Sequence, residues 1–376
     1  MRIAHVTASL SRLGYGVKVA VENLSRAMSD LGHEVKVIGL EDELWTSGED
    51  KIWQGAEPLA CPTAGPKGLG YAPLMTQAIV DFEPDIVHSH GLWTLHARSV
   101  LKWHNKTGGA YVTSPHGMLT PVAFTYSKEK KALARHWFQD RMIHQSSGLH
   151  ATCDAEVSEI RGYGYKGRVL VFPNGIMEQP KINVDKNTPM EAVFIGRLHD
   201  VKGPDLLLKA WSHVEASFPN WRVRIIGPSE RAYRVKLETL SKTLGLKNAS
   251  IEEAVPPQER DRILAGAELN ILPSLNENFA ISVAESLAME TPVIANKGAP
   301  WKGLEDHGCG WWIDKGVEPL AAGMRIAMKL PKVKRAEMGK RGREWIHAEF
   351  TWPRIAENAL TQYQSIIDRT EHKSIK

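Results

Sequence analysis

Short runs of β-branched and aliphatic residues alternate with longer helical patterns along this whole sequence. The runs are Ile3–Ala8, Glu34–Ile38, Asp85–His88, Ala110–Ser114, Leu149–Thr152 and Val169–Phe172, then Glu191–Ile195, Arg222–Ile226, Ser250–Glu253, Leu269–Leu272 and Val293–Ala295. Strands that alternate with helices form parallel sheets with helices on both faces. The sequence therefore predicts an α/β fold with doubly wound, Rossmann-like parallel sheets.

The chain length indicates more than one domain. At 376 residues the chain exceeds the size that a single hydrophobic core usually serves. We expect one domain at 1–175 and a second at 190–350, facing each other across a cleft. Periodicity lapses between them, which predicts a linker at 176–189. Residues 351–376 carry a helical apolar pattern that needs a surface to pack on, and we expect a C-terminal helix there that crosses back to the first domain.

Composition excludes several classes of protein. A hydrophobic fraction of 43% with 24% charged residues is typical of a globular protein. No signal peptide and no apolar stretch of roughly 20 residues is visible, so we expect a cytoplasmic protein. The net charge of +4 suits an anionic ligand and does not call for nucleic acid. The cysteines at 61, 153 and 309 are far apart and odd in number, so we expect no disulfide framework and no metal.

Two glutamates stand just after the run Leu269–Leu272. Glu277 lies in the loop, and Glu285 follows inside a helix predicted to begin near Ala280. The first amides of such a helix lie at the carboxyl end of the strand, where open α/β sheets bind ligands and where a phosphate is attracted. Carboxylates suit the hydroxyls of ribose and sugars. The ordinary alternative is a solvated loop acid and an unremarkable helix residue.

A basic turn, Ile195–Gly203, precedes this acidic segment in the same predicted domain. Arg197 can hold phosphate oxygens with its planar guanidinium, and Lys202 supplies a point charge. Together they can neutralise the charge that builds on a departing nucleoside diphosphate, as a metal ion does in other transferases. Taken alone, a basic turn is more often a solvated loop.

The two motifs together resemble the E-x7-E signature and the Gly-Arg-Leu-x3-Lys-Gly turn of retaining GT-B glycosyltransferases of family 4. The resemblance implies metal-independent transfer, with retention, of a sugar from a UDP- or GDP-sugar to a glycan, lipid-linked or small-molecule acceptor, in surface-polysaccharide synthesis. The leaving phosphate would take the acceptor proton. The resemblance implies a catalytic set of His116, Arg197, Lys202 and Glu277, and a donor-binding set of Gly14, Gly16, Arg197, Lys202, Glu277, Asn278, Phe279, Ala280 and Glu285.

Two elements of the first domain extend the resemblance. Gly14-Tyr15-Gly16 follows the first strand, where a glycine-rich turn lets amides approach a phosphate closely. Val19 stands where a dinucleotide site would have its third glycine, which argues against such a site. The family usually has adjacent glycines here, and commonly a glycine at the position of Ala280. His116 resembles the family histidine that reaches the transferred sugar, although a lone histidine is more often structural.

Residues 126–145 mix basic and apolar side chains at helical spacing. They predict an amphipathic helix that either rests on an anionic membrane, at its inner face, or buries its apolar stripe in the core. His88, His90 and His96 match no standard zinc spacing, and we expect them to line the acceptor side of the cleft.

Three alternatives stay open. A sugar-nucleotide epimerase of GT-B architecture would release free nucleotide without an acceptor. A non-catalytic sugar-nucleotide-binding scaffold is disfavoured because Arg197, Lys202, Glu277 and Glu285 are all present. A periplasmic-type sugar-binding protein is disfavoured because no signal peptide is visible.

Overall fold

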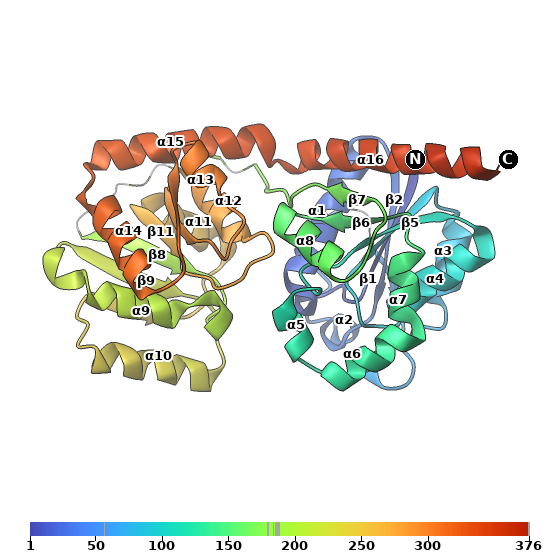
Figure 1. The fold of residues 1–376 in the computed structure, drawn as a ribbon, viewed down its shortest axis with the longest axis horizontal. Helices are drawn as coiled ribbons and strands as arrows, with labels where there is room; N and C mark the ends of the chain where they lie inside the picture. Colours follow the sequence, from blue (N-terminus) through green and yellow to red (C-terminus); the bar gives the residue numbers. More distant parts are fainter. Residues whose placement is uncertain (56, 179, 183, 185–188, 375–376) are drawn as a thin grey trace. The chain divides into compact units, whose positions relative to one another are not determined.

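The chain forms two compact units in the computed structural model, which describes residues 1–55, 57–178, 180–182, 184 and 189–374 (Figure 1). The first unit comprises Met1–Gly175 with Trp352–Lys376, and the second comprises Ile176–Thr351. Each unit is built on one parallel sheet with helices packed on it, which confirms the predicted α/β fold class.

The first sheet has seven strands in the order β3-β2-β1-β4-β5-β6-β7. Their bounds are β1 Arg2–Thr7, β2 Glu34–Leu40, β3 Leu59–Cys61, β4 Ile86–His90, β5 Ala110–Ser114, β6 Gly148–Ala151 and β7 Val169–Val171. The sequence pattern missed β3. The order reverses between β1 and β4, so the loops after these strands lie side by side at the carboxyl edge.

The helices of the first unit are α1 Tyr15–Asp30, α2 Glu43–Ser47, α3 Met75–Phe82, α4 His96–Thr107, α5 Pro121–Thr125, α6 Lys128–Ala134, α7 Asp140–His144, α8 Asp154–Gly162 and α16 Trp352–Ser374, with the short turns η1 Arg12–Gly14, η2 Lys67–Leu69 and η3 Arg135–Gln139. Helix α16, red in Figure 1, lies alongside α1. Its apolar face, including Trp352, Ile355 and Tyr363, is buried against the core of this sheet. Each such large side chain contributes about 1.5–3 kcal/mol by leaving water.

The predicted helix over 126–145 is confirmed for Lys128–His144, which is helical throughout. Helices α6 and α7 are joined by the π-helical segment η3, and Tyr126 precedes them in extended conformation. A π turn accommodates one extra residue. Here it allows the neighbours Phe138 and Gln139 both to be buried, with the Gln139 Oε1 accepting from the Trp93 amide at 2.8 Å.

The second sheet has six strands in the order β10-β9-β8-β11-β12-β13. Their bounds are β8 Met190–Ile195, β9 Trp221–Ile226, β10 Ala249–Glu252, β11 Leu269–Leu272, β12 Val293–Asn296 and β13 Gly310–Ile313, of which the sequence pattern missed β13. Strand β8 pairs directly with β11, so the loops that carry the basic turn and the acidic segment leave the sheet next to each other.

The helices of the second unit are η4 Asp200–Lys202, α9 Pro204–Ser212, η5 Glu215–Ser217, α10 Arg231–Thr243, α11 Pro257–Gly266, α12 Ile281–Ala288, α13 Gly303–Asp306, α14 Val317–Lys329 and α15 Lys332–Glu349. Among the residues that the structure describes, no helix combines the length and the apolar character that crossing a membrane requires.

The predicted linker, 176–189, falls partly outside the described residues, at 179, 183 and 185–188. Of its described part, Ile176 forms an isolated parallel bridge with Thr351 and lies in one apolar cluster with Phe279. Ile182 packs on the cluster that contains Leu264. These residues therefore belong to the packing of the second unit.

Candidate active site

The basic turn and the acidic loop meet through an ion pair. The Lys202 Nζ donates to both carboxylate oxygens of Glu277, each at 2.6 Å. The Ser274 hydroxyl donates to Glu277 Oε1 at 2.7 Å. The Glu277 side chain is only 7% exposed, whereas Lys202 keeps 27%. The fold thus brings together two predicted site residues from separate loops and leaves the ammonium partly accessible.

Close backbone approach explains why the two loops can touch. Gly203 adopts φ +70°, and a Cβ there would lie 2.6 Å from the Pro273 carbonyl oxygen. A Cβ at Gly298 would lie 2.3 Å from the carbonyl oxygen of Ser274. The Leu275 amide donates to the Val201 carbonyl at 2.8 Å. Glycine is therefore required on both sides of the acidic loop.

Arg197 lies directly after β8, on a turn that the sheet edge holds in place. The Leu198 amide donates to the Pro228 carbonyl at 2.8 Å, and the Leu198 side chain is buried. A Cβ at Gly227 would lie 1.8 Å from the Gly196 carbonyl oxygen. The close approach of these two backbone segments therefore also requires glycine. The Arg197 side chain is exposed at the same carboxyl edge as Lys202.

The start of α12 is formed without a capping side chain. Its N-cap is Ala280, at φ 62° and ψ 66° in the left-handed region. Phe279 and Ala280 are buried, Asn278 is half-buried, and the Phe279 carbonyl accepts from the Trp301 indole. The left-handed conformation costs an alanine about 1–2 kcal/mol, which explains why glycine is common at this position in the family that the sequence resembles.

Glu285 is paired with a cation that the sequence did not indicate. The Arg260 guanidinium lies 2.7 Å from Glu285 Oε1 and 2.9 Å from the adjacent Asp261 carboxylate. Burial raises the pKa of Glu285, and the Arg260 charge opposes that rise. Glu277 and Glu285 therefore have separate basic partners, Lys202 and Arg260. No pattern in the sequence marks Arg260, because it lies inside the ordinary surface helix α11.

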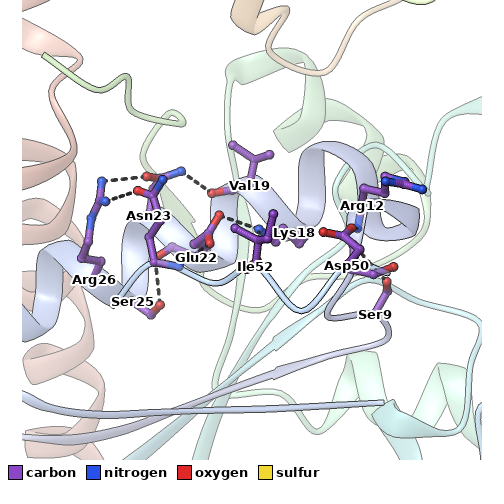
Figure 2. A network of polar contacts seen from close by, with 12 residues as sticks. Ser9, Arg12, Lys18, Val19, Glu22, Asn23, Ser25, Arg26, Asp50 and Ile52 are labelled. Atoms are coloured by element: carbon purple, nitrogen blue, oxygen red, sulfur yellow. Dashed lines mark hydrogen bonds and ion pairs between the residues drawn. The ribbon is translucent and has the colours of Figure 1, made fainter. Parts of the chain in front are cut away.

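The loop between β1 and Gly14 in the first unit is held by hydrogen bonds to acidic side chains. The Arg12 amide donates to Asp50 at 2.5 Å, and Lys18 on α1 pairs with Glu22 at 2.8 Å (Figure 2). The Ser9 hydroxyl donates to Asp42 at 2.7 Å. The contacts of Ser9 and Arg12 hold the loop that leads to Gly14, and the Lys18–Glu22 pair lies within α1.

The conformational strain in this loop falls on Tyr15 and not on the glycines. Tyr15 has φ 46° and is 66% exposed, whereas Gly14 ends η1 and Gly16 lies inside α1. A Cβ at Gly14 would lie 2.9 Å from the Lys18 Cβ, so Gly14 is needed for packing. Nothing lies within 4 Å of a Cβ built on Gly16.

His116 sits at the end of β5 in a strained turn. Its φ is 51°, and its Nε2 lies 3.0 Å from the Nδ1 of His90. The buried Glu156 carboxylate accepts from the next amide, that of Gly117, at 2.7 Å. The turn is thus held by the ring of His116 itself and by the amide that follows it.

The prediction that His88, His90 and His96 line a cleft is wrong. All three are at most 2% exposed, because they lie within or beside central strands and are satisfied by internal hydrogen bonds. The ligand atoms of His5, His88 and His90 lie within 4.8 Å of one another, a spacing that a metal ion can use. However, both ring nitrogens of His88 and of His90 already have hydrogen-bond partners. The donor set present therefore does not fit a metal without breaking those bonds.

Two family models together match residues 15–345. Residues 176–345 match the model described as glycosyl transferases group 1, and residues 15–175 match the glycosyl transferase 4-like domain. The chain is a group 1 glycosyltransferase. The enzyme is 25% identical to a D-inositol 3-phosphate glycosyltransferase of Corynebacterium urealyticum over 97% of this chain and 96% of that protein. It is 30% identical to a protein of the same name from Segniliparus rotundus, over 75% of this chain and 66% of that protein.

Solved structures show that this glycosyltransferase has the GT-B fold. Sucrose-phosphate synthase from Thermosynechococcus elongatus matches with TM-score 0.78 and 17% identity, covering 98% of this chain and all of that one. The Anabaena protein HepE, solved in complex with UDP and glucose, matches with TM-score 0.77 and 17% identity over 97% of this chain and 100% of that one. The family membership sets aside the epimerase, binding-protein and scaffold alternatives.

Proposed function

We propose that this glycosyltransferase uses a nucleoside diphosphate sugar, with UDP or GDP as the nucleotide. The observation that carries the proposal is the junction of Lys202, Ser274 and Glu277 at the carboxyl edge of β8 and β11. It combines a partly accessible ammonium with a buried carboxylate. The ammonium suits the diphosphate, and the carboxylate suits the hydroxyls of the sugar.

The role proposed for each site residue follows from the two separate ion pairs, Lys202–Glu277 and Arg260–Glu285. Arg197 and Lys202 hold the diphosphate, with the amides at the start of α12 near Asn278 and Phe279. Glu277 holds the sugar, and Glu285, charge-balanced by Arg260 at 2.7 Å, holds the ribose. The Gly14–Gly16 loop and His116 act from the first unit on the phosphate and the sugar.

Metal-independent transfer with retention is part of the same proposal. Two cations on one turn, Arg197 and Lys202, supply positive charge where the leaving diphosphate develops negative charge. The leaving phosphate then takes the proton from the attacking acceptor hydroxyl, so the acceptor oxygen bonds to the anomeric carbon on the face from which the phosphate departs.

For the acceptor we propose a hydroxyl of a phosphorylated small molecule, and D-inositol 3-phosphate is the first compound to assay. This choice is supported by the relatives that bear that name and match in nearly full length. An acceptor glycan or lipid-linked glycan of surface-polysaccharide synthesis is the alternative, and product analysis with each acceptor separates the two.

The donor proposal is tested by thermal unfolding with UDP-, GDP- and ADP-glucose. We expect a UDP- or GDP-sugar at 100 times its Kd to stabilise the fold by about 2.7 kcal/mol. Glu285→Gln should weaken that ligand about tenfold or more, because it removes a charge-assisted acceptor. Glu337→Gln on exposed α15 is the matched control. The donor proposal is wrong if neither UDP-glucose nor GDP-glucose raises Tm.

We also propose that α6 and η3 make peripheral contact with an anionic membrane. Part of the apolar stripe of this segment is buried in the core, at Phe138, Met142 and Ile143. Another part faces solvent, because Leu133 and Trp137 are 67% and 48% exposed. The exposed side chains of Lys128, Lys130 and Arg135 lie on the same short stretch. Basic residues around exposed apolar ones are typical of interfacial helices.

The membrane contact is tested by co-sedimentation with phosphatidylglycerol vesicles. Leu133→Gln should lower the bound fraction about tenfold, because a buried leucine contributes roughly 1.5–3 kcal/mol. Ile326→Gln, on exposed α14 of the other unit, is the control and should bind as the wild type does. Equal binding of both variants, or binding to neutral vesicles alone, would contradict the contact.

A further inference from the structure

Three imidazoles form a hydrogen-bonded row in the first unit, and His116 is its last member. His5 on β1 places Nδ1 2.9 Å from Nε2 of His90, at the end of β4. The Nδ1 of His90 lies 3.0 Å from Nε2 of His116. His5 and His90 are 0% and 2% exposed, so no solvent intervenes between them.

The protons in this row can be counted. Burial lowers the pKa of His5 to about 3 and that of His116 to about 4, and it lowers the pKa of His90 well below its ordinary value. The three rings are therefore neutral at neutral pH, and each carries one N–H. Each nitrogen-to-nitrogen contact needs one proton, and His90 can donate in only one direction. Only two arrangements remain.

In the first arrangement His5 donates to His90, His90 donates to His116, and His116 carries its own proton on Nδ1. In the second the direction is reversed, and the proton of His5 lies on its Nε2. Within the described residues, His5 Nε2 is buried and has no hydrogen-bond partner. A buried N–H without an acceptor is rarer than an unused acceptor and more costly. The first arrangement is therefore the favoured one.

A second chain of hydrogen bonds, from Tyr363 to the Phe172 carbonyl, lies beside the row of imidazoles and does not change its hydrogen bonds. The His150 Nε2 lies 2.8 Å from the Phe172 carbonyl, which can only accept. The protons must then run from Tyr363 to His88 at 2.5 Å, from His88 to Ser114 at 2.6 Å, and from Ser114 to His150 at 2.6 Å. Both nitrogens of His88 are occupied, so His88 does not compete for His90.

We propose that His90, backed by His5, is a positioning residue that holds His116 as the Nδ1–H tautomer. His116 then offers the transferred sugar a hydrogen-bond donor at Nδ1 and does not act as a base. This inference rests on the proposed function, in which His116 contacts the sugar. No pattern in the sequence distinguishes His90 from the other histidines of the strand.

Two isosteric substitutions test the direction of the bond. His90→Asn keeps an N–H near the position of Nδ1, whereas His90→Asp offers an acceptor there and favours the opposite tautomer of His116. We expect His90→Asn to retain kcat within about threefold, and His90→Asp to lower kcat about tenfold or more with a smaller change in donor KM. A buried carboxylate also costs stability, so Tm is measured for both variants. Equal losses of kcat in the two variants would overturn the proposal.

Nitrogen NMR of the imidazoles tests the wild-type tautomer directly and requires no variant to be active. In the full-length, unliganded protein the Nδ1 of His116 should show a proton and its Nε2 none, with the signals assigned through His116→Gln. A proton on Nε2 would overturn the inference. His116→Ala tests the proposed contact with the sugar separately from the tautomer. Undiminished turnover of this variant would contradict the sugar contact, whichever tautomer His116 has.

Discussion

Replacing Lys202 with methionine is expected to lower kcat about 10²–10³-fold, the usual cost of removing one preorganised group that stabilises charge in a transition state. Methionine keeps much of the length of the side chain and removes only the charge. The loss should fall mainly on kcat, because the charge on the diphosphate grows as the bond to the sugar breaks. Initial rates over a matrix of donor and acceptor concentrations measure both constants.

Lys236→Met is the matched control for this prediction. Lys236 forms an ion pair at 3.0 Å with Asp200, which lies on the same turn as Lys202. The side chains of Lys236 and Asp200 are both more than half exposed. Such a surface pair contributes little, so turnover should stay close to wild type. Near-normal kcat in Lys202→Met, with Tm unchanged, would remove the phosphate role of Lys202 and with it the central claim about the site.

Replacing Arg335 with methionine is expected to destabilise the second unit by about 3–5 kcal/mol, because it leaves a buried carboxylate without its cation. The Arg335 Nε lies 2.8 Å from Glu268 Oε2, and both side chains are only 3% exposed. The guanidinium also lies 4.9 Å from the ring centre of Trp221 and donates to the Leu330 carbonyl. Hydrogen exchange at the amides of β8 and β11, in the full-length protein, reports the loss locally.

Two further variants sharpen this second prediction. Arg222→Met removes one of the two cations that pair with Glu191. Because Arg222 is 47% exposed and Arg224 stays as the second partner, the change should cost no more than about 1 kcal/mol. The double variant Arg335→Met with Glu268→Leu should recover most of the stability, since an apolar pair of suitable volume replaces a buried ion pair well. If the double variant is no more stable than Arg335→Met, the unpaired charge is not the cause.

Much of the architecture was predictable because it depends on local periodicity. The strands β1, β5, β8 and β11 each bury alternate or continuous apolar residues, and that pattern is visible without a structure. The three-residue strand β3 carries no such signal. The π-helical segment within 128–144 was not predictable either, because the burial of Gln139 depends on its contact with Trp93, far along the chain.

The motif residues of the candidate site were visible in the sequence, but their partners were not. Lys202 and Glu277 stood out because basic and acidic residues followed predicted strands. Arg260, His5 and Glu156 did not, and His90 stood out only as a cleft-lining residue, because each takes its importance from contacts with residues on different elements.

The sequence by itself determined the fold class, the family and the residue types available for binding a nucleotide sugar, because strand and helix periods and short motifs are properties of neighbouring residues. Only the tertiary structure decided which charges neutralise one another and how the buried imidazoles are ordered. Those features depend on distances of about 3 Å between residues far apart in the chain, where hydrogen bonds and ion pairs form or fail. These distances are set by the order of the strands and by glycines at which two backbone segments approach closely, and no local sequence pattern encodes either.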